Sequence, residues 1–167
     1  MIVAALALLL FAVSARAGGP PKVVVEPGGC PDLCCTYGLW AAKRNVRLFA
    51  KPDSSQVAAV INTGEEVTAG DSVLDVKPHK VKVTMSDLYD STLPRGSKIY
   101  LIRRLADGNW RVWFNGRFID NVHEMWDAAE SSKISSVWWV RVQTTDGRLG
   151  WTKDPSAFNG SRQTSCR

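Results

Sequence analysis

The chain has 167 residues, of which 45% are hydrophobic and 22% are charged, and its formal net charge at pH 7 is +5. These values are ordinary for a globular protein and exclude a chain without a folded core. The length suits one domain, or one domain that carries an elaboration.

The first 17 residues have the pattern of a secretory signal peptide. The apolar run IVAALALLLFAV is too short to cross a bilayer comfortably, and the small-x-small pattern Ala15-Arg16-Ala17 follows it. Cleavage after Ala17 would leave the mature protein free in an exported compartment, either the periplasm or the extracellular space. No basic residue precedes the apolar run, and a retained membrane anchor is therefore the alternative.

Residues 18–36 are predicted to form an arm rich in glycine and proline. Within it, Lys22–Val25 has the composition of an edge strand. The arm carries three of the four cysteines, Cys30, Cys34 and Cys35, and the fourth lies in the C-terminal tail, residues 161–167.

An even number of cysteines in an exported chain indicates disulfide bonds, and four cysteines allow three connectivities. A vicinal Cys34–Cys35 bond is disfavoured by its strained geometry. We therefore expect Cys166 to join Cys34 or Cys35 and the other of these to join Cys30, so that one bridge ties the chain ends together. A zinc site or a redox pair is the alternative, but the one cluster has no nearby histidine and no Cys-x-x-Cys spacing.

The run NVRLFAKPDSSQVAAVINTGEEV, residues 45–67, predicts strands on either side of a loop. The loop, Phe49–Gln56, contains proline and serine residues that break regular structure. Gly64-Glu65-Glu66 marks a turn into a further strand, Val67–Ala69.

Residues 72–135 are also predicted to be β-structure. Val73–Val76 and Val81–Met85 flank Pro78-His79, and the second run alternates apolar with polar residues. A three-stranded meander is expected next, followed by a short helix within Val122–Lys133. The strands of this meander are Ile99–Ile102, Trp110–Phe114 and Arg117–Ile119, and its turns are Ala106–Asn109 and Asn115-Gly116.

The segment SSVWWVRVQTTDGRLGW, residues 135–151, predicts a β-hairpin. Its first strand is apolar, aromatic or β-branched apart from Arg141, and Asp146-Gly147 supplies a turn that tolerates positive φ. Strict alternation places one tryptophan on each face, so that one can be core while its neighbour stays available to a ligand. One face would carry Trp138, Val140 and Val142, and the other Val137, Trp139 and Arg141.

This hairpin resembles the distal hairpin of SH3-like domains, and more closely that of the bacterial SH3 domains of secreted and envelope proteins. Residues 45–67 resemble the other half of the family pattern: an Asn-Val-Arg opening strand, a Pro and Ser loop, a Val-rich strand, then Gly-Glu and Val. The resemblance implies an all-β fold, a small SH3-like barrel with stapled termini. The domain would span residues 37–160, with halves 39–71 and 136–160 interrupted by the β-meander insertion 72–135.

The resemblance also implies a ligand groove between the loop Phe49–Gln56 and the Trp138 hairpin. Pro155-Ser156-Ala157-Phe158 resembles the Pro-Ser-Asn-Tyr element that follows the last hairpin in eukaryotic SH3 domains and helps to line their peptide groove. Seven tryptophans exceed what one small barrel core needs, and an exposed aromatic side chain can stack on a peptide or a sugar. The candidate ligand-binding residues are Trp138, Trp139, Trp151, Trp113, Phe49, Pro155 and Phe158.

No pattern in the chain indicates catalysis. His79 and His123 lie in different loops, and neither is near a cysteine or serine in a nucleophilic arrangement. The acidic pairs Glu65-Glu66 and Asp87 with Asp90 have the sequence surroundings of turns and loops. We therefore expect neither an enzyme nor a metal or cofactor.

The resemblance implies a non-enzymatic, exported binding module whose ligand is a peptidoglycan stem peptide or another envelope component. A second hypothesis is a protein-interaction or inhibitor module that docks on an exported partner through the insertion, and a third is an unrecognised hydrolase. The basic residues are spread over many strands and would attract anions such as wall polymers or lipid headgroups rather than nucleic acid. They include Lys77, Lys80, Lys82, Arg103, Arg104, Arg111 and Arg117.

Overall fold

The computed structural model describes residues 19–31, 35–85 and 93–161. The predicted signal peptide, Cys34 and Cys166 lie outside the described residues. The described chain is built from antiparallel strands with very little helix, which confirms the prediction of an all-β fold.

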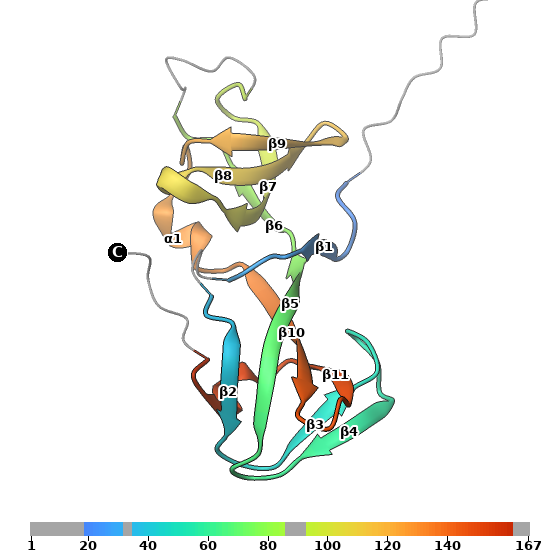
Figure 1. Cartoon of the computed structure of the whole chain (residues 1–167). Coiled ribbons are helices and arrows are strands. Elements are labelled where there is room, and N and C mark those ends of the chain that lie inside the picture. The colour runs from blue at the N-terminus through green and yellow to red at the C-terminus, as the bar shows by residue number, and fades with distance from the viewer. Residues whose placement is uncertain (1–18, 32–34, 86–92, 162–167) are drawn as a thin grey trace, which may run out of the picture.

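The main sheet has eight strands and curls around a hydrophobic core (Figure 1). Its strand order is β12-β2-β5-β10-β11-β3-β4, and β1 also pairs with β5. Strand β1 includes part of the predicted edge strand in the arm. The strands are β1 (Val24–Pro27), β2 (Gly38–Ala42), β3 (Val46–Phe49), β4 (Val57–Ile61), β5 (Glu66–Lys77), β10 (Ser135–Thr144), β11 (Leu149–Thr152) and β12 (Phe158–Asn159).

Strands β5 and β10 are the longest of the described strands, and they pair with each other along most of their length. They pair from Val67 opposite Thr144 to Lys77 opposite Ser135, with a bulge between Val140 and Val142. The division expected at residue 72 falls inside β5, which continues without a break to Lys77. The segment between these two strands, residues 78–134, therefore begins and ends at neighbouring positions of the main sheet.

That segment forms a sheet of its own, the small sheet, with the order β6-β7-β8-β9 (Figure 1). Strands β6 (His79–Lys82), β7 (Lys98–Arg104), β8 (Trp110–Phe114) and β9 (Arg117–Val122) confirm the predicted meander and add a fourth strand to it. Asn115 and Gly116 have φ angles of 47° and 83°, as a two-residue turn of type I′ requires. The predicted helix is a single turn, α1 (Ala128–Ser131).

Each sheet has a hydrophobic core. Trp40, Leu48 and Phe158 are among the buried residues of the main core, whereas Leu101 and Val112 belong to the core of the small sheet. The two units are nevertheless joined by apolar contacts, because Ile102 of β7 is fully buried in the main core and Ile134 packs against both cores.

A buried carboxylate also joins the two units. Glu26 of β1 has a side chain that is only 8% exposed, and it accepts hydrogen bonds from Arg103 of β7 at 2.9 Å and Arg111 of β8 at 2.8 Å. A buried charge is stable only when it is paired, so these two guanidinium groups fix β1 against the small sheet. Arg111 also forms an ion pair with Asp120 on β9, at 2.9 Å.

The structure contains a disulfide bond between Cys30 and Cys35, with the Cα atoms 5.9 Å apart. This confirms one of the two expected pairings of Cys30. The bond that would then join Cys34 to Cys166 lies outside the described residues.

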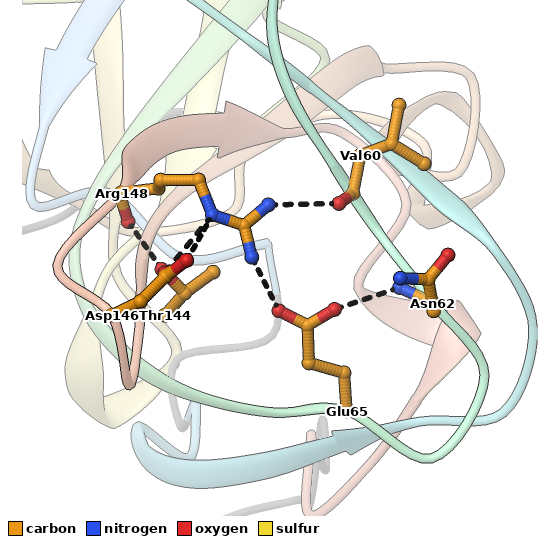
Figure 2. A network of polar contacts seen from close by, with 6 residues as sticks. All are labelled: Val60, Asn62, Glu65, Thr144, Asp146 and Arg148. Atoms are coloured by element: carbon orange, nitrogen blue, oxygen red, sulfur yellow. Dashed lines mark hydrogen bonds and ion pairs between the residues drawn. The ribbon is translucent and has the colours of Figure 1, made fainter.

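Arg148, in the turn between β10 and β11, connects this turn to the one between β4 and β5 (Figure 2). Its guanidinium donates to the Val60 carbonyl at 3.1 Å, to Glu65 at 2.9 Å and to Asp146 at 2.7 Å. Asp146 also accepts a hydrogen bond from the Thr144 hydroxyl. One side chain thus stabilises two turns that lie 83 residues apart.

We expect Asp146 to make the protein less stable in acid. The Thr144 hydroxyl, and after it the Arg148 guanidinium, hold the pKa of Asp146 below its ordinary value. A carboxyl with a lowered folded pKa stabilises the protein above its unfolded pKa, and that contribution is lost as the pH falls through the folded pKa. Thermal unfolding midpoints measured below about pH 4 should therefore fall more steeply for the wild type than for Asp146→Asn.

Asp107→Asn is the matched control for this experiment, because Asp107 is an exposed carboxyl in another turn and its positive φ of 57° is accessible to asparagine. It should follow the wild-type pH profile. If Asp146→Asn follows that profile as well, the hydrogen bonds to Asp146 do not contribute to stability.

Candidate functional site

The predicted hairpin is present as β10 and β11, and Gly147 in its turn has a φ of 87°. Trp138 faces the main core and is 6% exposed, in agreement with the predicted alternation. Trp139 faces the other way but is also buried, at 4% exposed. The expectation that one tryptophan remains open therefore fails, because a partner covers the second face as well.

Phe49 of β3 is that partner. The rings of Phe49 and Trp139 meet edge to face, with their centroids 5.8 Å apart, and Lys153 places its ammonium 5.7 Å from the centre of the Trp139 ring. The Trp139 indole N–H donates to the carboxylate of Asp75 on β5 at 3.0 Å. Trp139 is therefore held in one orientation by contacts from three different segments.

A cavity of about 550 Å³ lies beside Trp139. Its walls come from the arm and β1, from the loop that follows β3, and from the facing parts of β5 and β10. This volume is within the range of small-molecule and peptide side-chain sites. The lining includes Val23, Val25, Pro52, Asp53, Asp75, Lys77, Val137, Trp139 and Lys153.

The charges around this cavity are mixed. Asp53 and Asp75 provide carboxylates, and Lys77 and Lys153 provide ammonium groups. Burial raises the pKa of Asp75, the Trp139 N–H opposes that rise, and the nearby Asp53 charge adds to it. Such a cavity can pair with both charges of a ligand that carries an amine and a carboxylate.

A second cavity, of about 570 Å³, is adjacent to the first, and Ser136, Val137 and Lys153 line both. Trp138 and Pro155 form its other wall. The indole Nε1 of Trp138 is buried and has no hydrogen-bond partner within the described parts of the chain. We call the two cavities together the groove.

The structure brings together four of the predicted ligand-binding residues. Trp138, Trp139 and Pro155 line the groove, and Phe49 packs edge to face against Trp139.

The other three candidates lie elsewhere. Phe158 is 2% exposed, packs against Trp40 in the main core and is not among the residues that line the groove. Trp151 is half-buried opposite Phe49 on the neighbouring strand, and Trp113 lies on the small sheet.

Sequence reasoning missed several residues of the groove, namely Val23 and Val25 in the arm, Asp75 and Lys77 on β5, and Lys153 after β11. Val25 reaches the site because β1 pairs with β5, opposite Asp75. No local pattern specifies that pairing. The loop residues Pro52 and Asp53 fall within the segment that was expected to border the groove.

The two histidines lie outside the groove. The Nε2 atom of His79 is 2.8 Å from a carboxylate oxygen of Glu130, and His123 is exposed. Hydrogen bonds from Lys133 and then His79 lower the pKa of Glu130. Among the residues that the structure describes, no group of three or more His, Cys, Asp or Glu side chains is arranged to hold a metal ion, and no helix is both long and apolar enough to cross a membrane.

No family model, curated protein or solved structure matches this chain.

Proposed function

We propose that the chain is a non-enzymatic, exported binding module of the SH3-like class, which binds cell-wall peptides or another envelope component in the groove. The observation that carries this proposal is the position of the groove. It lies between the loop after β3 and the β10–β11 hairpin, where the resemblance to bacterial SH3 domains implies a ligand site.

The strand connections support the SH3-like part of the proposal. After the β10–β11 hairpin the chain forms a single 3-10 turn, Pro155–Ala157, and then strand β12. Strand β12 pairs with β2, so the last strand of the main sheet returns beside one of its first. SH3-like barrels similarly have their termini close together.

The chemistry of the groove supports a peptide ligand. Apolar side chains that are 40–59% exposed, Val23, Val25 and Val137, lie next to carboxylate and ammonium groups. Stem peptides carry both charges, together with backbone amides and small apolar side chains.

Co-sedimentation of the purified protein with insoluble peptidoglycan tests this function. Both tryptophans of the groove are buried, so their removal would disturb the core, and we choose the exposed rim instead. The double variant Val137→Ser/Lys153→Ala should lose about tenfold or more in affinity, which corresponds to about 1.4 kcal/mol. Binding by the wild type should persist at moderate salt, because apolar contacts are not screened.

The matched control is Val60→Ser/Lys43→Ala, which makes the same two changes at exposed positions outside the groove, on β4 and in the loop after β2. It should bind as the wild type does. Binding that disappears with salt, or that both double variants lose equally, would reflect general charge attraction and contradict the proposal. Release of soluble wall fragments by the wild type would indicate a hydrolase instead.

A further inference from the structure

One face of the small sheet carries a continuous row of side chains across all four strands. Lys80 of β6 is opposite Tyr100 of β7, Tyr100 is opposite Trp113 of β8, and Trp113 is opposite Phe118 of β9. Side chains directly opposite each other on one face are in contact range. The Lys80 ammonium lies 6.0 Å from the Tyr100 ring centre, and the rings of Trp113 and Phe118 are 4.8 Å apart.

The same face is strongly basic at the end formed by β6 and β7. Lys82 is opposite Lys98, and because side chains alternate along a strand, both point to the side of Lys80 and Tyr100. All three lysines are exposed, and within the described residues no carboxylate forms an ion pair with them. Arg111, by contrast, is paired with Glu26 and Asp120.

A small cavity of about 220 Å³ lies where the lysines and the aromatic row meet. Two ammonium groups, three aromatic side chains and the side chain of Asn115 line it, and Gly19 of the arm closes one side. No carboxylate is among its lining residues. We call the cavity and the aromatic row beside it the basic aromatic face.

The geometry points to an acidic glycan as the ligand of the basic aromatic face, with an acidic sugar unit in the cavity. The apolar C–H faces of a sugar pack on aromatic side chains, and lysine ammonium groups bind its carboxylate or sulfate group. The cavity is smaller than the 300–1,000 Å³ that drug-sized ligands occupy, which suits one sugar ring. This site is separate from the groove and does not depend on the function proposed for it.

A single-stranded nucleic acid fits the same face less well. Such strands bind where successive bases can stack on parallel aromatic platforms. The planes of Trp113 and Phe118 instead meet at 76°, so the two rings do not offer parallel surfaces.

The test is a titration of the purified protein with four soluble probes: a polygalacturonate oligosaccharide, a heparin oligosaccharide, neutral dextran and poly(dT). We expect saturable binding to one or both acidic glycans and none to dextran. The surface variant Lys80→Ala/Lys98→Ala should weaken that binding by about tenfold or more, because it removes the ammonium groups that would pair with the acidic group of the sugar. Phe118→Ala, at a side chain that is already 39% exposed, should weaken it without unfolding the sheet.

Lys43→Ala/Lys51→Ala is the matched control, since it removes two exposed lysines from the loops after β2 and β3 and changes the net charge equally. It should bind both glycans as the wild type does. Equal losses in the two double variants, tighter binding to poly(dT) than to either glycan, or no binding to any probe would overturn the proposal. An effect of the lysines without any effect of Phe118→Ala would also overturn it, because the aromatic row would then have no role.

Discussion

Replacing Trp139 with alanine should lower the free energy of unfolding by about 3–4 kcal/mol, the usual cost of removing a buried aromatic side chain. Trp139 is 4% exposed, meets Phe49 edge to face and donates its indole N–H to Asp75. The variant would therefore lose packing and leave a partly buried carboxylate without its donor. Urea denaturation at pH 7 measures the effect.

The pH dependence of this loss separates the lost hydrogen bond from the lost packing. Burial raises the folded pKa of Asp75, and Trp139→Phe, which removes the indole donor but keeps an aromatic ring in place, should raise it further. An acid with a raised folded pKa destabilises the protein increasingly as the pH rises above its unfolded value, about 3.9. The stability deficit of Trp139→Phe relative to the wild type should therefore shrink as the pH is lowered from 7 towards 4.

Trp151→Ala is a suitable comparison, since Trp151 is only half-buried next to Phe49 and should cost less. If Trp139→Ala instead costs under about 1 kcal/mol, the ring makes few stabilising contacts and would be free to serve as a ligand platform.

Glu26→Gln should lower the free energy of unfolding by about 2–3 kcal/mol, because hydrogen bonds to charged groups contribute more than neutral ones and both arginines would lose their buried partner. The Glu26 side chain is 8% exposed and bonds to Arg103 and Arg111. Since it links β1 to the small sheet, hydrogen exchange should also accelerate in β1. Urea denaturation and amide exchange measure the two effects.

Asp120→Asn is the control for this substitution, because it removes another carboxylate from Arg111 but at a side chain that is 48% exposed. Exposed ion pairs contribute about 0–1 kcal/mol, so this variant should be nearly as stable as the wild type. If the two variants lose similar amounts of unfolding free energy, the burial of Glu26 does not determine how strongly β1 is held against the small sheet.

Local turn chemistry explains why the hairpins could be predicted from the sequence. Gly147 in one short loop, and Asn115 and Gly116 in another, have positive φ angles, and both loops form the expected turns. The position of Trp138 in the core could also be predicted from the sequence, because a strand places alternate residues on opposite faces.

The long-range pairings could not be predicted in the same way. Nothing near Trp139 indicates that Phe49 will cover it, and nothing near Val25 indicates that β1 will pair beside Asp75 and close one wall of the groove. The extension of β5 beyond residue 72 could not be predicted for a similar reason. The β pattern of Val73–Val76 continues the strand before it, and only the pairing with β10 shows how far β5 extends.

The most direct test of ligand binding in the groove is a titration of isotopically labelled protein with a soluble wall stem peptide, followed by amide and indole NMR shifts. We predict that the shifts concentrate on Asp53, Val137, Lys153 and the indole N–H of Trp139, which line the groove together. Shifts confined to the small sheet, or no saturable shifts, would contradict the proposed function and place any ligand contact elsewhere on the protein.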